Sequence, residues 1–271
     1  MSISSAVRDG RTDLLTRLRR GFWGRLLRKR LAWFGLLIMV MFVGAALTAD
    51  IIAPYEPARQ DYGSVLLPPG KGHLMGTDNF GRDVCSRVIH GSRVSLTVGL
   101  LAVGLALVTG AIIGLISGYY LGWVDEVLMR IMDALYSFPA LLLALAITVV
   151  LGPGLTSVII AIGIVYTPVF ARVVRSRVLS VREQDYVSAA VALGISTPRL
   201  IFRHILPNVA APLIVQASLN VSSAIIAEAS LSFLGIGVQP PTPSWGTMLK
   251  TGYAYMEIAP WLAVFPGIAI F

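Results

Sequence analysis

Few residues of this chain have side chains and spacings that could support catalysis or metal binding. Two of its three histidines, His73 and His90, stand in one polar stretch with Asp78 and Asp83, and the single cysteine, Cys85, lies among them. Imidazole and carboxylate groups can hold a divalent metal, but these four follow no compact ligand spacing. A lone thiol with no Cys-His-Asn grouping is typical of a packing residue. We therefore predict no metal site and no catalytic residue.

Glu228 is a candidate for a different kind of chemistry, because it stands inside a long apolar stretch. If that stretch crosses a membrane, an unpaired carboxylate there costs at least about 2 kcal/mol, and such residues commonly mark a transport pathway. Two other interpretations stay open: a hydrogen-bonded packing residue, and a position near the outer headgroups. The pattern G-x-x-x-x-G-K-[ST], which cradles nucleotide phosphates, is absent from the sequence. We therefore expect any nucleotide energy to come from a partner chain.

The polar stretch 185–208, which we call the wedge, is typical of two short helices around a break. Gly194 favours a helix end in the left-handed conformation, and Thr197 with Pro198 favours a new helix start directly after it. Pro207 predicts the end of that second helix. Such a helix pair would project from the surface that the flanking apolar segments build. The other wedge residues of interest are Ser188, Ala189, Ala190, Arg199, Arg203, His204 and Leu206.

The composition decides the class of protein that must position these residues. Hydrophobic residues make up 56% of the chain and charged residues 13%, and the mean hydropathy is +0.77. Soluble domains have roughly 45–50% apolar and about 25% charged residues. The sequence therefore predicts an all-α integral membrane protein in a lipid bilayer.

Apolar segments divide the chain into four parts. We expect a basic cytoplasmic tail over 1–30, a first transmembrane helix over 31–53, and an extracytoplasmic loop over 54–94 with a short amphipathic helix that Thr77 or Asp78 caps. A membrane core over 95–271 follows, and its polar loop 172–207 contains most of the wedge.

Within the core, further membrane helices are expected over 95–118, 139–151, 155–171 and 208–238. An interfacial amphipathic stretch that begins at Val124 precedes the helix 139–151, and Pro139 should kink that helix near its start. The stretch from Pro260 to Phe271 would measure about 18 Å as a helix, less than the ~30 Å of a bilayer core. We therefore expect a sixth helix that is cut short in this sequence.

The Lys and Arg residues are distributed unevenly between the two sides that this arrangement defines. Nine of the 22 lie in the tail, where they could contact nucleic acid, but their position directly before an apolar helix favours the inner membrane surface. With the amino terminus inside, the inner segments hold 16 and the outer loops hold 6. This bias places the amino terminus and the wedge in the cytoplasm.

The helix 208–238 carries a stripe of polar side chains. At 100° per residue, Gln216, Asn220, Ser223 and Ser230 fall within an arc of about 80°, and Glu228 lies outside it. A stripe of this kind favours a water-accessible pathway, although hydrogen bonds between helices would give the same pattern. We take these five residues as the candidate translocation path.

Three glycines in the helix 95–118 predict a close helix contact. Gly110, Gly114 and Gly118 form two consecutive G-x-x-x-G steps. Small residues at this spacing let two helix backbones approach each other, although glycine is common in membrane helices generally. We therefore expect this face to pack on another helix.

The wedge resembles the cytoplasmic loop of ABC importer permeases. In that loop an E-A-A motif is followed by three residues, a glycine, nine residues and I-x-L-P. Here Ser188 replaces the glutamate and His204 replaces the isoleucine, and the resulting H-I-L-P-N ending is usual in the peptide and nickel permease branch. The resemblance extends over nearly the whole chain after residue 30, and it is greatest to the C-type permease subunit of dipeptide, oligopeptide or glutathione importers. The further matching segments are Gly76-Thr77-Asp78, Gly81-Arg82-Asp83, Ser86-Arg87, Met129-Arg130 with Asp133 and Pro139, Leu231-Ser232-Phe233-Leu234-Gly235, Gln239-Pro240-Pro241 and Trp245-Gly246.

This resemblance implies a six-helix, type I (MetI-like) permease of the bacterial inner membrane, without enzymatic activity of its own. It implies a second homologous permease subunit, two ATPase subunits that bind ATP and Mg²⁺, and an extracytoplasmic binding protein that delivers peptides or glutathione. The wedge would dock on an ATPase subunit, where Arg199 and Arg203 could pair with acids. No nucleic acid partner is implied.

Other functions stay open at this point. A nickel or other small-solute importer shares the same scaffold. A stand-alone secondary transporter or channel with Glu228 as an ion relay is more remote, because only Glu228 and Asp50 lie in or beside the membrane helices and no inverted repeat is evident. A membrane-embedded hydrolase would need a paired acid and base, which the predicted topology does not bring together.

Overall fold

The computed structural model describes residues 30–271, and within that range every regular element is a helix, apart from one bridge between Thr77 and Asp83. Three of these described helices are long and apolar enough to cross a membrane, and a bent pair is a fourth candidate. The predicted all-α membrane fold is confirmed. The helices are α3 (Arg30–Leu47), α4 (Ala49–Ile52), α5 (Val84–Tyr120), α6 (Gly122–Tyr136), α7 (Ala140–Leu151), α8 (Leu155–Arg182), α9 (Asp185–Ala192), α10 (Thr197–Leu200), α11 (Leu206–Leu234), α12 (Trp245–Ala254) and α13 (Trp261–Ile270), with a 3₁₀ turn η1 (Tyr62–Ser64) and a π-helical turn η2 (Ile201–Ile205).

The first compact unit ends at Thr48 and contains α3. The Thr48 hydroxyl donates to the Gly44 carbonyl at 2.6 Å, a bond of the type that bends helices. The helix therefore stops at Leu47, short of the end at residue 53 that the sequence predicted, and α4 begins the second unit at Ala49. The predicted basic tail, except Arg30, lies outside the described residues.

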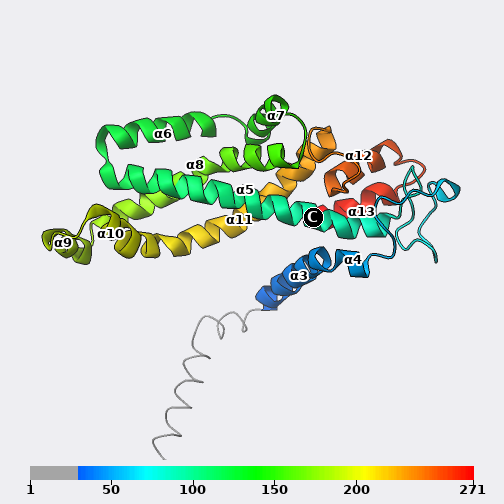
Figure 1. Ribbon diagram of the computed structural model, residues 1–271, viewed down its shortest axis with the longest axis horizontal. Helices are drawn as coiled ribbons and strands as arrows, with labels where there is room; N and C mark the ends of the chain where they lie inside the picture. Colours follow the sequence, from blue (N-terminus) through cyan, green and yellow to red (C-terminus); the bar gives the residue numbers. More distant parts are fainter. Residues whose placement is uncertain (1–29) are drawn as a thin grey trace, which may run out of the picture. The chain divides into compact units, whose positions relative to one another are not determined.

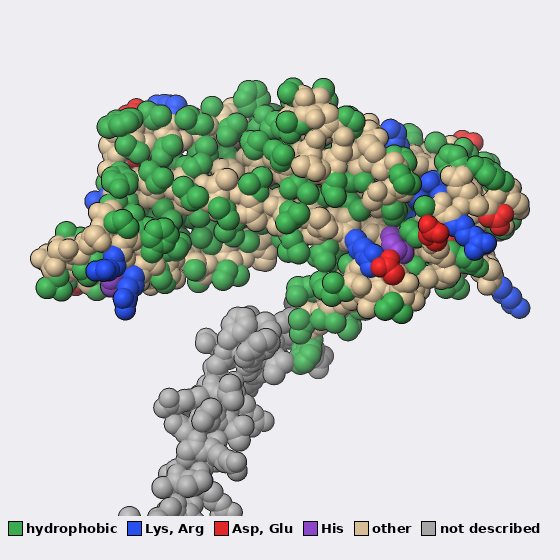
Figure 2. Space-filling view, viewed as in Figure 1, with side chains coloured by type: hydrophobic (Ala, Val, Ile, Leu, Met, Phe, Trp, Pro, Cys, Tyr) green, Lys and Arg blue, Asp and Glu red, His purple; other side chains and the backbone are tan. Residues whose placement is uncertain are grey.

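The second unit, residues 49–271, is built on the long helices α5, α8 and α11. The short helices α9 and α10 lie at one end of these long helices, and α12 and α13 lie with the polar loop at the other (Figure 1). Charged side chains gather toward the ends, and hydrophobic side chains cover most of the stretch between them (Figure 2). An apolar stretch between polar ends is what a protein that crosses a bilayer requires.

Helix α5 is one continuous helix of 37 residues, where the sequence predicted a short surface helix and a separate membrane helix. Its cap is Asp83, which accepts a hydrogen bond from the Ser86 amide at 2.7 Å. The predicted caps, Thr77 and Asp78, are wrong because both side chains bind within the preceding loop: Thr77 accepts from the Leu67 amide, and Asp78 accepts from the Phe80 amide. At about 55 Å, α5 is longer than a bilayer core is thick.

The predicted close contact of the glycine face is confirmed, and its partner is α8. A Cβ atom on Gly110 would lie 2.5 Å from Cβ of Phe170, and one on Gly118 would lie 2.8 Å from Cβ of Val178. Gly114 faces the Ala171 carbonyl in the same way. Only glycine permits this approach of the two backbones.

We expect Gly110→Ala to lower the thermal stability and the membrane abundance of the protein. The added methyl has no space against α8, and overpacking of this kind costs about 1–3 kcal/mol. Gly104→Ala is the matched control, because a Cβ on Gly104 of the same helix meets nothing within 4 Å and alanine favours helix. Thermal unfolding of the purified protein and quantitative immunoblotting measure the effect. Equal stability of the two variants would contradict this packing account.

The predicted third membrane helix is short and sharply bent from the segment before it. Helices α6 and α7 meet at 95° across Ser137, Phe138 and Pro139. The amphipathic α6 lies against α8 through ion pairs: Arg175 Nε donates to Asp125 Oδ1 at 2.6 Å, and Arg172 donates to Asp133 at 2.6 Å. The carboxylates of Asp125 and Asp133 on α6 are therefore neutralised by arginines of α8, and this explains how a charged helix packs against α8.

At the other end, two tryptophans connect α12 and α13 to the start of α5. Trp245 Nε1 donates to the Val88 carbonyl at 2.9 Å, and Trp261 Nε1 donates to the Thr77 carbonyl at 3.3 Å. The indole of Trp245 also fills the space that a Cβ on Gly91 would occupy. These contacts join α12, α13 and the preceding loop to the start of α5.

Candidate functional site

The wedge begins with α9, whose end at Gly194 follows the Schellman pattern. The Gly194 amide donates to the Val191 carbonyl at 2.9 Å, and the Ile195 amide donates to the Ala190 carbonyl at 3.2 Å. Gly194 adopts φ of +74°, which favours glycine because a side chain would crowd its own backbone. The structure therefore confirms the predicted break and its cause.

The second wedge helix does not end at Pro207, and that prediction is wrong. Helix α10 continues through the π-helical turn η2 into α11, so that the helix runs from Thr197 to Leu234. A proline has no amide hydrogen and clashes with the carbonyl four residues earlier. The wider π turn, in which the Leu206 amide donates to the Ile201 carbonyl, accommodates Pro207 without a break.

The wedge has a buried inner face and an exposed outer face. The side chains of Val187, Ala190, Leu200 and Ile205 are buried in the main hydrophobic core. Leu193 is 81% exposed and Phe202 67% exposed. The outer face includes Ser188, Ala189, Val191, Leu193, Gly194, Arg199, Phe202, Arg203 and Pro207, with His204 and Leu206 half-buried beside it.

Hydrogen bonds attach the wedge to the ends of the long helices. Arg182, the last residue of α8, donates to the Tyr119 carbonyl of α5 at 3.0 Å. The Tyr119 hydroxyl donates to Thr197 at 3.4 Å, and Asn208 donates to the Tyr186 hydroxyl at 3.1 Å. A force on the outer face would therefore reach α5 through the contact of Thr197 with Tyr119, and α11 through the continuous helix from Thr197 to Leu234.

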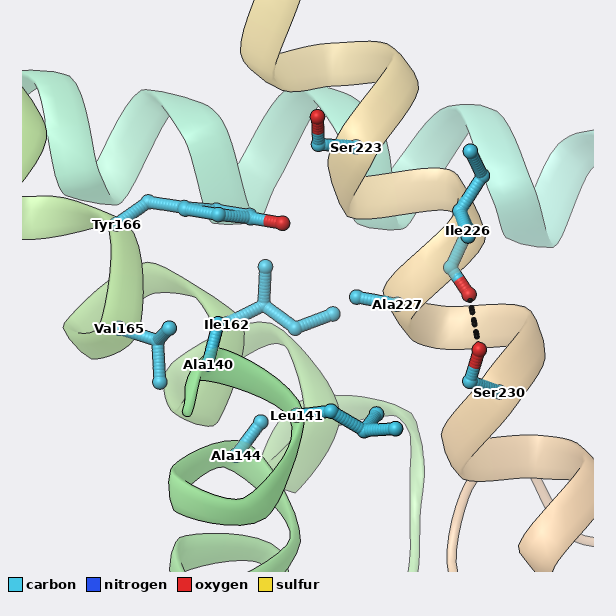
Figure 3. A pocket seen from close by; sticks show the side chains of 10 residues that line it. All are labelled: Ala140, Leu141, Ala144, Ile162, Val165, Tyr166, Ser223, Ile226, Ala227 and Ser230. Carbon is cyan, nitrogen blue, oxygen red and sulfur yellow. Dashed lines mark hydrogen bonds between the residues drawn. The ribbon is translucent and has the colours of Figure 1, made fainter. Parts of the chain in front are cut away.

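The polar stripe on α11 divides into two parts. Gln216 donates to the buried Asn220 side chain at 3.2 Å, so these two amides bind each other. Ser223 and Ser230 line a pocket of about 310 Å³ between α7, α8 and α11. The Tyr166 side chain of α8 extends across this pocket toward Ser223, and the Ser230 hydroxyl donates to the Ile226 carbonyl at 2.8 Å (Figure 3). No sequence pattern indicates that Tyr166 lies beside the stripe, because it stands on a different helix.

Glu228 lies away from this pocket and is fully buried. It accepts a hydrogen bond from the Ser232 hydroxyl at 2.7 Å, and Ser232 in turn accepts from the Val238 amide at 3.1 Å. The second carboxylate oxygen, Oε2, is buried without a hydrogen-bond partner among the described residues. Of the interpretations that the sequence left open, this placement favours the hydrogen-bonded packing residue.

We expect Glu228→Ala to destabilise the corner between α11 and α12, and Glu228→Gln to retain most of the stability. Glutamine keeps an acceptor for Ser232, whereas alanine leaves a cavity and an unpaired buried hydroxyl, at a cost of about 2–5 kcal/mol. Thermal unfolding of the purified protein distinguishes the two. Equal melting temperatures for Glu228→Ala and the unsubstituted chain would contradict a positioning role.

The histidines and acids of the polar loop form separate pairs. His73 Nδ1 lies 2.9 Å from Asp83, Arg82 donates to Asp78 at 2.6 Å, and His90 Nε2 lies 3.2 Å from Asp50. No group of three or more His, Cys, Asp or Glu side chains within residues 30–271 is arranged to hold a metal ion. These pairs stabilise the loop and the start of α5.

Comparison with known proteins places this geometry in context. Residues 110–271 match the binding-protein-dependent transport system inner membrane components, and residues 17–69 match the N-terminal TM domain of oligopeptide transport permease C. The chain is 45% identical to the dipeptide transport system permease protein DppC of Alkalihalophilus pseudofirmus, over 91% of this chain and 81% of that protein. It is 46% identical to the di/tripeptide transport system permease protein DppC of Pseudomonas aeruginosa, over 92% and 84%.

Two further similarities extend this comparison. The chain is 40% identical to the glutathione transport system permease protein GsiD of Pectobacterium atrosepticum, over 93% of this chain and 84% of that protein. A chain in a solved structure of inward-facing MetNI methionine ABC transporter superposes with a TM-score of 0.54 at 17% identity, over 68% of this chain and 89% of that chain. The latter similarity concerns the fold.

Proposed function

This chain belongs to the family of binding-protein-dependent transport system inner membrane components, and from that premise we propose that it is the permease subunit of an ATP-driven importer of dipeptides, oligopeptides or related small peptides such as glutathione. It is a multi-pass inner membrane component rather than an enzyme. The proposed substrate class rests on the sequence identity of 45% and 46% to permeases named for dipeptide and di/tripeptide transport.

The proposed importer contains a second, homologous permease subunit, two ATPase subunits and an extracytoplasmic binding protein. ATP and Mg²⁺ bind to the ATPase subunits. The amino terminus and the wedge lie in the cytoplasm, as the 16 to 6 distribution of Lys and Arg favours. The loop 54–83 and helices α12 and α13 then face the binding protein.

The wedge is the proposed coupling surface for an ATPase subunit. Its exposed Leu193 and Phe202 supply apolar area, and Arg199 and Arg203 supply charges for acids at the rim of the partner's groove. Its inner face is fixed in the hydrophobic core. Because α10 continues into α11, movement of the wedge would move α11 directly, and α11 carries the candidate path.

The proposed path follows the polar stripe of α11. Ser223 and Ser230 offer hydroxyl groups to substrate in the pocket, and Gln216 and Asn220 extend the stripe toward the wedge. The fully buried Glu228 supports the path by fixing Ser232 one turn later on α11, where Ser232 also accepts from the Val238 amide, instead of contacting substrate.

Reconstitution tests this function. The chain, its partner permease, both ATPases and the binding protein are placed in proteoliposomes, and uptake of radiolabelled dipeptides, glutathione and Ni²⁺ is measured with and without ATP. We expect ATP-dependent peptide uptake that requires every subunit. Uptake by the chain alone would support a stand-alone transporter, and uptake of Ni²⁺ without peptide would overturn the substrate class.

A further inference from the structure

The pocket between α7, α8 and α11 has the chemistry of a site for a neutral, apolar group. Its volume of about 310 Å³ is within the usual range of ligand pockets, roughly 300–1,000 Å³. Within residues 30–271, no Asp, Glu, Lys or Arg side chain lines it. Its apolar walls are formed by Ala140, Leu141, Ala144, Ile162, Val165, Ile226 and Ala227.

We propose that this pocket receives the apolar side chain of a transported peptide, and that Tyr166 determines how large a side chain enters. This inference rests on the proposed peptide import. A charged peptide terminus does not suit the pocket, because a charge without a partner is expensive in such surroundings. An apolar side chain gains free energy when it leaves water for these walls.

The hydroxyl groups are placed to bind the peptide main chain beside that side chain. Ser223 and Ser230 are seven residues apart on α11, so they lie on one face with a rise of about 10.5 Å between them. An extended peptide spans about 3.3–3.6 Å per residue, so about three residues cover this distance. The Ser230 hydroxyl donates to the Ile226 carbonyl and can therefore accept from a peptide amide, whereas the Ser223 hydroxyl can donate or accept. The pair therefore suits the main chain of any peptide sequence.

Tyr166 limits the pocket because its ring extends across it. Figure 3 shows the Tyr166 side chain reaching from α8 toward Ser223, above the side chain of Ile162. Truncation of the ring would enlarge the pocket, whereas a ring added at the exposed Ala140 on α7 would fill it from the opposite helix. The two changes should shift side-chain preference in opposite directions.

The test compares uptake of Phe-Ala and Ala-Ala by the complete reconstituted importer. Each peptide is supplied on saturating binding protein, so that the ratio of uptake rates reports the permease. We expect Tyr166→Ala to raise the Phe-Ala to Ala-Ala ratio at least about 10-fold and Ala140→Phe to lower it, since size differences in apolar pockets give about 10–200-fold discrimination. Tyr166→Phe, which retains the ring, should leave the ratio unchanged.

The outcomes separate this proposal from the function on which it rests. Absence of peptide uptake by the unsubstituted importer would overturn the peptide function itself. Normal peptide uptake with unchanged ratios in assembled Tyr166→Ala and Ala140→Phe importers would overturn the pocket alone. An equal loss of both peptides, with less partner permease bound, would assign the pocket to subunit packing and would also overturn it. If Tyr166→Ala does not assemble, Ala140→Phe at its exposed position decides.

Discussion

Replacing Gly194 by valine is expected to abolish ATP-driven uptake while the protein remains inserted in the membrane. Gly194 has φ of +74°, and a β-branched residue held in that region costs about 1–3 kcal/mol. A Cβ on Gly194 meets no atom within 4 Å, so the effect arises from the backbone and not from a clash. The chain relieves the strain by reorienting α9 against α10, and this distorts the outer face of the wedge.

Reconstituted importers give the measurement for Gly194→Val: uptake should fall to background while ATP hydrolysis continues without coupling to transport. Gly194→Asn should retain partial uptake, because asparagine tolerates the left-handed conformation. Gly152→Val is the matched control, since Gly152 has φ of +86° and equally open surroundings, but lies in the turn between α7 and α8. Normal coupled uptake by Gly194→Val would contradict the coupling role of the wedge.

The second large effect is expected for Phe202→Asp, which should release from the complex the ATPase subunit that docks on this wedge. Phe202 is 67% exposed on the outer face, and burial of such a ring in a partner contributes about 1.5–3 kcal/mol. An aspartate there also leaves a charge in an apolar contact. We expect the affinity of this chain for its ATPase subunit to fall at least about 100-fold, as for central interface residues.

Co-purification from detergent, followed by titration of purified ATPase, measures this loss. Phe202→Leu keeps an apolar group and should bind nearly normally. Ile258→Asp is the control for the charge itself, because Ile258 is 65% exposed between α12 and α13, at the other end of the second unit (Figure 1). Retention of both ATPase subunits by Phe202→Asp would place the docking surface elsewhere.

The sequence predicted the wedge well where local geometry decides the structure. Gly194 ends α9 because the Schellman hydrogen bonds require a left-handed residue, and this requirement is visible in the residue type alone. The predicted helix end at Pro207 was wrong because the π-helical turn η2, a rare feature, accommodates the proline without a break. The predicted cap of α5 was wrong because the Thr77 and Asp78 side chains bind partners in the loop, which residue types do not reveal.

The candidate path was predictable only as a pattern on one helix. Helical periodicity placed Ser223 and Ser230 together, but the pocket that they line also needs Tyr166 of α8 and the α7 helix. Glu228 was a pathway candidate because the sequence does not show how deeply it is buried. Its partner Ser232 lies one turn later on the same helix, whereas its full burial comes from packing between helices.

A crosslinking measurement tests most directly whether the wedge contacts an ATPase subunit. A photoreactive amino acid at Leu193, which is 81% exposed on the wedge, is introduced into an importer that retains peptide uptake, and the same probe at Ile258 serves as the comparison. Our account predicts that illumination joins position 193 to an ATPase subunit and that position 258 forms no such product. A crosslink from position 193 to the extracytoplasmic binding protein, or an ATPase crosslink from position 258 instead, would contradict it.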